Sequence, residues 1–240
     1  MVEKLSEDNW MPLEANPEVI NEFIAKMGFE TIFYRFYDIL SFDEMGLAAI
    51  PQPVQAIVFL FDDTEVQEKH REEQEAKLKA SGQYIDKDLF FMTQYAENAC
   101  GTIAVFHSLV NLYNKTQSFV TKGSYLDRFI AETSKLSPDE RGKYFEEDDN
   151  LKEEHKKAAK EGQSKQEEMP TAHFVCFIQF NGHLYELDGV KFAPINHGEC
   201  SEDEFLSKAF KVIKEFTERD PDQIKFTALA LAPDDGSMFD

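Results

Sequence analysis

Apolar residues recur at helical spacing in several parts of the chain. Between positions 19 and 27 they fall three or four residues apart, which predicts an amphipathic helix. Asn16 can cap this helix, Pro17 suits its first position and Gly28 can end it. Further helices are predicted over 42–49, 64–80 with Gly82 as its end, 124–133 and 202–218, together with one that opens at Ser137-Pro138 and one that starts near Asn98.

Other segments have the pattern of strands. The uninterrupted apolar run Val54 to Phe61 predicts a buried strand, and 224–231 and the aromatic stretch 29–37 are further candidates. Two alternating runs flank Asn181-Gly182, which is a strong hairpin signal. Strands mixed with helices predict an α/β (α+β) fold in which helices flank a central, antiparallel-rich sheet.

One segment departs from both patterns. Residues 146–168 contain nine acidic and five basic residues and a single large aliphatic residue, Leu151. We therefore expect a mobile connection that buries little surface. No repeat or Gly/Ser-rich linker divides the chain, so we predict a single domain over 1–233, followed by a short acidic tail, 234–240.

Composition narrows the class of protein. The 240 residues are 42% hydrophobic and include 22 Phe, which is enough for a sizeable core. A formal net charge of −21 makes nucleic acid an unsuitable partner and would attract a basic one. The first residues lack the apolar run of an export signal, and no run is long enough to span a membrane. We therefore expect a cytoplasmic monomer with no membrane partner.

Cysteine usage points to a free thiol. The three cysteines are widely spaced and form no CxxC pair, so they indicate no disulfide framework. No HExxH motif, clustered Cys/His pattern or Gly-rich phosphate loop is present, so we expect no metal and no cofactor.

Cys100 is the strongest nucleophile candidate. In the stretch Asn98-Ala99-Cys100-Gly101, Asn98 can cap a helix whose apolar face begins at Ile103. That places Cys100 in the first turn, where free N–H groups and the helix dipole favour the reactive thiolate, and Gly101 leaves room for a carbonyl group. The competing interpretation is a small core residue. Cys176, inside a strand, and Cys200, after an apparent turn at His197-Gly198, are weaker candidates.

The hairpin supplies a base and a residue to orient it. A two-residue turn at Asn181-Gly182 puts Val175 opposite Asp188, so His173 and Asp188 lie on one sheet face, one diagonal step apart. An Asp at that place can hold the imidazole while the other ring nitrogen meets Cys100. Alternatively, His173 only starts a strand and Asp188 only opens a turn.

The other histidines are weaker base candidates, for different reasons. His183 points to the opposite face, His107 lies about 10.5 Å along the helix from Cys100 at about 1.5 Å per residue, and His70 and His155 sit in charged, solvated stretches. His197 is the strongest rival. For an oxyanion, the Cys100 N–H and the Gln94 side-chain amide are the candidate donors.

Taken together, these residues resemble the ubiquitin carboxy-terminal hydrolase family of cysteine peptidases, most nearly its short single-domain members. The resemblance spans nearly the whole chain. It rests on Gln94, 98–102, His173 and 184–189, and on the flanking stretches 10–18 (WMPLEANPE), 194–198 (PINHG) and 218–221 (ERDP).

The resemblance implies a knotted, papain-like fold and a deubiquitinating thiol hydrolase. Cys100 would be the nucleophile that forms an acyl-enzyme, His173 the general base and acid, Asp188 its orienter and Gln94 the oxyanion stabiliser. The substrates would be esters, thioesters or amides of the C-terminal glycine of ubiquitin, with NEDD8 as a second modifier. The contacts with ubiquitin implied by the family are Pro12, Leu13, Glu14, Glu218, Arg219 and Asp220.

The resemblance also gives the segment 146–168 a role as a crossover loop near the cleft. Our hypothesis is that residues 150–168 admit small or unfolded leaving groups and exclude folded ones. Two alternatives remain at this point: a module that binds ubiquitin and turns over slowly, and a different cysteine enzyme with the same arrangement of residues.

Overall fold

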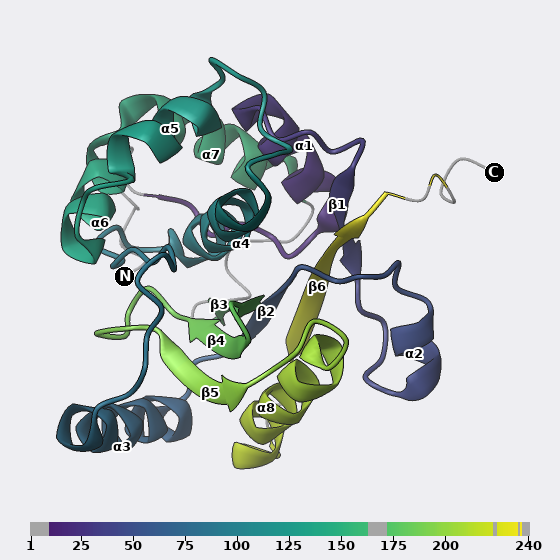
Figure 1. Ribbon diagram of the computed structural model, residues 1–240, viewed down its shortest axis with the longest axis vertical. Coiled ribbons are helices and arrows are strands. Elements are labelled where there is room, and N and C mark those ends of the chain that lie inside the picture. The colour runs from purple at the N-terminus through teal and green to yellow at the C-terminus, as the bar shows by residue number, and fades with distance from the viewer. Residues whose placement is uncertain (1–9, 163–171, 223–224, 235, 237–240) are drawn as a thin grey trace, which may run out of the picture.

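The computed structural model describes residues 10–162, 172–222, 225–234 and 236, and Figure 1 shows its ribbon. Helices and strands are mixed along the chain. Their order is α1 (Pro17–Met27), β1 (Tyr34–Asp38), α2 (Glu44–Ala48), β2 (Ala56–Asp62), α3 (Glu65–Ser81), α4 (Cys100–Thr116), α5 (Tyr125–Thr133), α6 (Pro138–Glu147), α7 (Asp149–Glu161), β3 (Ala172–Phe180), β4 (His183–Leu187), β5 (Ile195–Glu199), α8 (Phe205–Arg219) and β6 (Phe226–Pro233).

The strands form one six-stranded sheet in the order β1-β6-β2-β3-β4-β5, and every pairing is antiparallel. The buried strand β2 lies between β6 and β3 and alternates its side chains between two hydrophobic clusters. Val58 and Leu60 face the cluster that includes α1, α4 and α5, whereas Ile57 and Phe59 face the cluster that includes α8. Figure 1 shows the helices on both sides of the sheet. The predicted fold class is confirmed.

Local signals set several element boundaries as expected. The Asn16 side chain accepts a hydrogen bond from the Glu18 N–H at the start of α1, and Gly28 ends that helix at a φ of 97°. Ser137 and Glu140 form a reciprocal capping box at the start of α6. The Asn181-Gly182 hairpin has the predicted register, with Phe180 opposite His183.

Three local predictions were wrong. Of 29–37, only Tyr34 to Tyr37 joins a strand, because residues 31–33 form a turn after Phe29 makes an isolated bridge to Val120. The stretch around His197-Gly198 is the edge strand β5 rather than a simple turn, although its polar residues and glycine have low strand propensity. The acidic tail does not fray at once, because the Asp234 N–H donates to the Phe33 carbonyl.

The segment 146–168 needs the largest correction. Residues up to Glu147 belong to α6 and Asp149–Glu161 form α7, so most of it is helical rather than a mobile connection. The helix buries one stripe made of Leu151, His155, Ala158 and Ala159. Counting charges hid this stripe, because its small and polar members contribute little to hydrophobicity but occupy one helix face. Residues 163–168 lie outside the described part of the chain.

Candidate active site

The thiol of Cys100 lies at the first residue of α4, as the sequence predicted. Asn98 does not cap the helix: its φ is 60°, and Ala99 is the cap residue, with no side-chain hydrogen bond. The left-handed conformation of Asn98 turns the chain into the helix, and asparagine tolerates that conformation well. Because α4 has no side-chain cap, its first N–H groups and the positive end of its dipole stay available beside the sulfur.

Gly101 has a different role from the predicted one. A Cβ at this position would lie 3.1 Å from both Leu13 Cβ and Phe174 Cε2. Glycine therefore lets the N-terminal stretch and β3 pack closely against the start of α4, rather than opening space for a substrate carbonyl. The effect is to place β3, which begins next to His173, against the nucleophile's helix.

His173 and Asp188 come together at one end of the hairpin. The imidazole Nε2 lies 2.7 Å from Asp188 Oδ1, and both residues are buried. The Nε2 atom donates this bond to the carboxylate, which leaves Nδ1 for the side-chain hydrogen bond that joins His173 to Cys100. The ring of Phe61 packs edge-on against the imidazole, with the centroids 5.8 Å apart. The imidazole therefore contacts both the thiol and the carboxylate.

The electrostatics of this pair favour an imidazolium. Burial by itself lowers the pKa of His173, but the Asp188 carboxylate and the Cys100 sulfur outweigh it, so the pKa of His173 is raised well above its usual range. For Asp188, burial acts to raise the pKa, and the neighbouring His173 and Lys191 bring it below its usual value. The carboxylate is thus ionised near neutral pH and can stabilise a proton on His173.

Gln94 lies on the loop that leads to Cys100. Its backbone N–H donates to the Gly189 carbonyl at 2.8 Å, which ties this loop to the turn after Asp188. Its side-chain Nε2 donates to the Ala96 carbonyl at 3.1 Å, and the buried Oε1 has no hydrogen-bond partner among the described residues. Since an amide nitrogen carries two hydrogens, one N–H remains for an oxyanion.

The competing histidines have other partners. His107 is buried, its Nε2 accepts from the Met92 N–H at 3.1 Å, and burial lowers its pKa to about 3. His197 Nε2 lies 2.9 Å from Glu186 Oε2, and His183 Nδ1 lies 3.3 Å from Asn196 Oδ1. Burial raises the pKa of the Cys176 thiol and of the Cys200 thiol. These environments suit structural roles.

His155 is buried rather than solvated, which corrects the sequence-based view of it. Its Nε2 lies 2.5 Å from the Met11 carbonyl oxygen and therefore donates, and its Nδ1 accepts from the Thr102 hydroxyl at 2.6 Å. The ring also packs edge-on against Trp10. His155 thus joins α7 to the N-terminal stretch and to the first turn of α4, two residues after Cys100.

Acid should weaken this connection. Burial lowers the pKa of His155 to about 4, against about 6.5 in an unfolded chain. Between these values the unfolded state binds the proton and the folded state does not, so the free energy of unfolding falls by up to about 3 kcal/mol as pH drops from 6.5 to 4. Denaturant unfolding should show a smaller slope over this range for His155→Gln. Thr102→Val retains the imidazole and should retain the slope; equal slopes in His155→Gln and wild type would contradict the assignment.

The residues predicted to contact ubiquitin differ in accessibility. Leu13 is 4% exposed and packs on Gly101, so it stabilises the site from inside and does not contact a partner directly. Pro12 and Glu14 are half-buried beside it. The other group lies at the end of α8: Glu218 is exposed, Arg219 donates to Gln67, and Asp220 accepts from the Thr64 hydroxyl at 2.8 Å.

Sequence comparison matches residues 10–218 to the model of the family described as ubiquitin carboxyl-terminal hydrolase, family 1. The chain belongs to this family of ubiquitin carboxyl-terminal hydrolases. By family it is a cysteine-type ubiquitinyl hydrolase, as the sequence resemblance implied. A ubiquitin carboxyl-terminal hydrolase of Drosophila melanogaster is 41% identical over 224 residues, which cover 92% of this chain and 96% of the relative. Isozyme L1 of Rattus norvegicus is 40% identical over 220 residues with the same coverage.

Solved structures of the family have the same fold. The catalytic domain of Trichinella spiralis UCH37, bound to ubiquitin vinyl methyl ester, aligns with a TM-score of 0.73 at 24% identity over 98% of this chain and 100% of that one. A second UCH37 structure with the same ligand aligns with a TM-score of 0.71 at 23% identity, over 96% of this chain and 85% of that one.

Other binding chemistry is not indicated by the described residues. Among residues 10–162, 172–222, 225–234 and 236, no group of three or more His, Cys, Asp and Glu side chains could hold a metal ion. Within the same ranges no helix is both long and apolar enough to cross a membrane.

Sequence reasoning missed the groups that surround the candidate triad. Phe61 was predicted only as the end of a strand, and Glu186 and Lys191 were not singled out at all. The usable signal was alternation: Glu186 is two residues before Asp188 and so lies on the same sheet face, where an acidic side chain needs a buried partner.

Proposed function

We propose that this hydrolase cleaves the bond after the C-terminal glycine of ubiquitin, with Cys100 as nucleophile, His173 as general base and acid, and Asp188 as its orienter. The observation that carries the proposal is the position of His173. It is hydrogen-bonded to Asp188 at 2.7 Å on one side and to the thiol of Cys100 on the other. This is the nucleophile–base–orienter arrangement of thiol hydrolases.

The reaction follows from these positions. His173 takes the thiol proton, and the Cys100 sulfur attacks the glycine carbonyl carbon. The resulting oxyanion receives hydrogen bonds from the Cys100 N–H and from the Gln94 amide. His173 then protonates the leaving group as the carbon–leaving-group bond breaks, which leaves a thioester acyl-enzyme. Water, deprotonated by His173, attacks the thioester, and ubiquitin leaves as the thiol is restored.

The direct test uses ubiquitin that carries a fluorogenic C-terminal amide, beside the same adduct of NEDD8. We expect release from ubiquitin and a lower kcat/KM with NEDD8. Tight binding of ubiquitin without release would instead support a binding module with slow turnover. Neither binding nor release would contradict ubiquitin as the substrate.

We also propose that the connection from α7 to β3 limits the leaving group. Both of its anchors are next to the site: Gly162, after α7, approaches Glu14, and β3 begins one residue before His173. A chain section that joins two such points restricts what can reach Cys100, so small or unfolded leaving groups are the expected substrates.

Lengthening this connection should therefore change selectivity. We expect an insertion of about ten Gly/Ser residues after Gly162 to admit folded leaving groups, because the loop can then span a wider opening. Cleavage of a ubiquitin–folded-domain fusion should rise, while kcat/KM for the fluorogenic amide stays within about three-fold, since the triad is not altered. The same insertion at the Asn181-Gly182 turn is the control. Continued rejection of the fusion by the lengthened variant would disprove the gate.

A further inference from the structure

A buried charged cluster lies directly behind Asp188. Glu186 is 1% exposed and Lys191 is 6% exposed, and the Lys191 ammonium donates to Glu186 Oε1. The same ammonium donates to Gln74 Oε1 of α3 at 2.7 Å, and His197 of β5 donates to the other Glu186 oxygen at 2.9 Å. Both carboxylate oxygens of Glu186 are therefore occupied, by groups from two different parts of the chain.

This cluster is joined to Asp188 through a tight turn. The Lys191 N–H donates to the Asp188 carbonyl at 3.0 Å, and the Val190 N–H donates to Asp188 Oδ1 at 3.2 Å. Asp188 and Lys191 are thus the two ends of one turn. The Asp188 carboxylate projects to His173, and the Lys191 ammonium folds back to Glu186, two residues before Asp188 on the same face.

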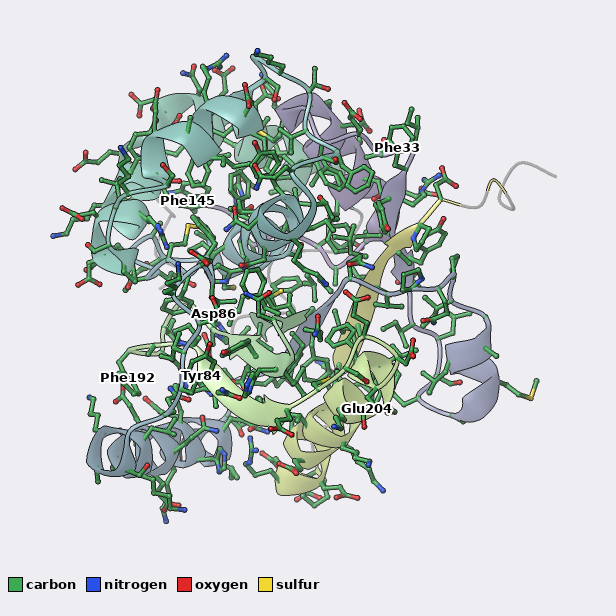
Figure 2. The ribbon with its side chains drawn as sticks, viewed as in Figure 1. Phe33, Tyr84, Asp86, Phe145, Phe192 and Glu204 are labelled. Carbon is green, nitrogen blue, oxygen red and sulfur yellow. The ribbon has the colours of Figure 1, made fainter. Side chains whose placement is uncertain are left out.

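Helix α3 holds the turn from outside. Besides the Gln74–Lys191 bond, Lys79 lies 5.0 Å from the ring of Phe192, the residue after Lys191. Figure 2 shows Phe192 next to α3. Movement of the turn would therefore break contacts with α3 as well as the Lys191–Glu186 ion pair.

We propose that Lys191 is a positioning residue that, through Glu186 and Gln74, holds the Asp188 carboxylate against His173 and balances the negative charge next to that pair. This inference rests on the proposed role of Asp188. Without the Lys191 charge, two buried carboxylates, Glu186 and Asp188, would lie on one face with less compensation, which is costly in a low-dielectric interior.

Other charged groups also act on this region and stay constant in the test. His173 of β3 faces Asp188 directly, and Arg71 of α3 and His107 of α4 interact with it electrostatically. Arg219 of α8, His70 of α3 and His197 of β5 interact with Glu186. None of these groups supplies the direct bond to Glu186 that also closes the Asp188 turn, which is the particular contribution of Lys191.

Removing one charge at a time gives opposite expectations. Lys191→Gln leaves Glu186 uncompensated, which stabilises the imidazolium of His173 and should move the limbs of the kcat/KM–pH profile to higher pH by about half a unit or more. Glu186→Gln leaves Lys191 uncompensated and should move them to lower pH by a similar amount. The double variant should return towards the wild-type profile. A purely structural role would lower the rate in both single variants without shifts of opposite sign.

The experiment measures kcat and KM of the full chain against pH with the fluorogenic ubiquitin amide. In both single variants we expect kcat to fall about ten-fold with little change in KM, because Asp188 acts on chemistry rather than on ubiquitin binding. Lys191→Arg keeps the charge and should keep the wild-type limbs. Lys115→Gln is the matched control, because Lys115 also contacts a glutamine and a glutamate, Gln179 and Glu202, at the other end of α4.

The outcomes separate the inference from the proposed function. An inactive wild type would contradict the function itself. An active wild type whose limbs stay in place in both Lys191→Gln and Glu186→Gln, or move in the same direction in both, would overturn the inference. If Glu186→Gln does not fold, Lys191→Gln against Lys191→Arg decides alone: limbs at the same pH in the two would overturn it.

Discussion

Cys100→Ala should lose hydrolysis of the fluorogenic ubiquitin amide, with kcat/KM reduced by at least about 10⁴-fold, because no other group can form the acyl-enzyme. The fold should be unaffected, since the side chain is half-exposed at the first residue of α4 and makes few core contacts. Stopped assays and mass spectrometry with a ubiquitin vinyl methyl ester give a second measure: wild type should gain the mass of one ubiquitin and Cys100→Ala should gain none.

Cys200→Ala is the matched control for the loss of a thiol. Cys200 is 2% exposed and burial raises the pKa of its thiol, so it should neither react nor affect the rate beyond about two-fold. Residual hydrolysis in Cys100→Ala above a hundredth of the wild-type rate would mean that another residue is the nucleophile.

Asp188→Asn should have the second-largest effect, a loss of about 10² to 10⁴-fold in kcat/KM with KM little changed. The carboxylate accepts the Nε2 proton of His173 and is a main reason that the pKa of His173 is raised. With a neutral amide, burial acts with less opposition, so the pKa of His173 falls. The imidazolium is then lost at lower pH, and the alkaline limb of the kcat/KM profile should move down.

Asp86→Asn is the control for removing a largely buried carboxylate elsewhere. Asp86 is 9% exposed, accepts from the Asp88 N–H at 2.9 Å and from Asn181 Nδ2 at 3.0 Å, and lies beside Tyr84 (Figure 2). Its variant should lose stability, measured as thermal unfolding, and keep the wild-type pH profile. An Asp188→Asn profile with the wild-type alkaline limb would show that Asp188 does not control the protonation of His173.

Much of the site could be predicted from local signals. The Asn181-Gly182 turn fixes the hairpin register, and the register alone puts His173 and Asp188 on one face, one step apart. The apolar run after Cys100 begins a helix whose first turn holds the thiol. These inferences worked because each depends on residues close together in sequence, where turn geometry and side-chain periodicity leave few alternatives.

Only the tertiary structure decided how the distant parts meet. The contact between Cys100 and His173 depends on the packing of Leu13 and Phe174 around Gly101, which no local pattern specifies. The helix α7 forms in a charged segment because its narrow stripe is buried by partners far away in sequence, such as Met11 and Thr102 for His155. Likewise, the Lys191–Glu186 pair is favourable only when Gln74 and His197 complete its hydrogen bonds in a buried place. The sequence by itself determined the elements and the chemistry they carry, whereas burial between distant segments determined which polar groups became partners.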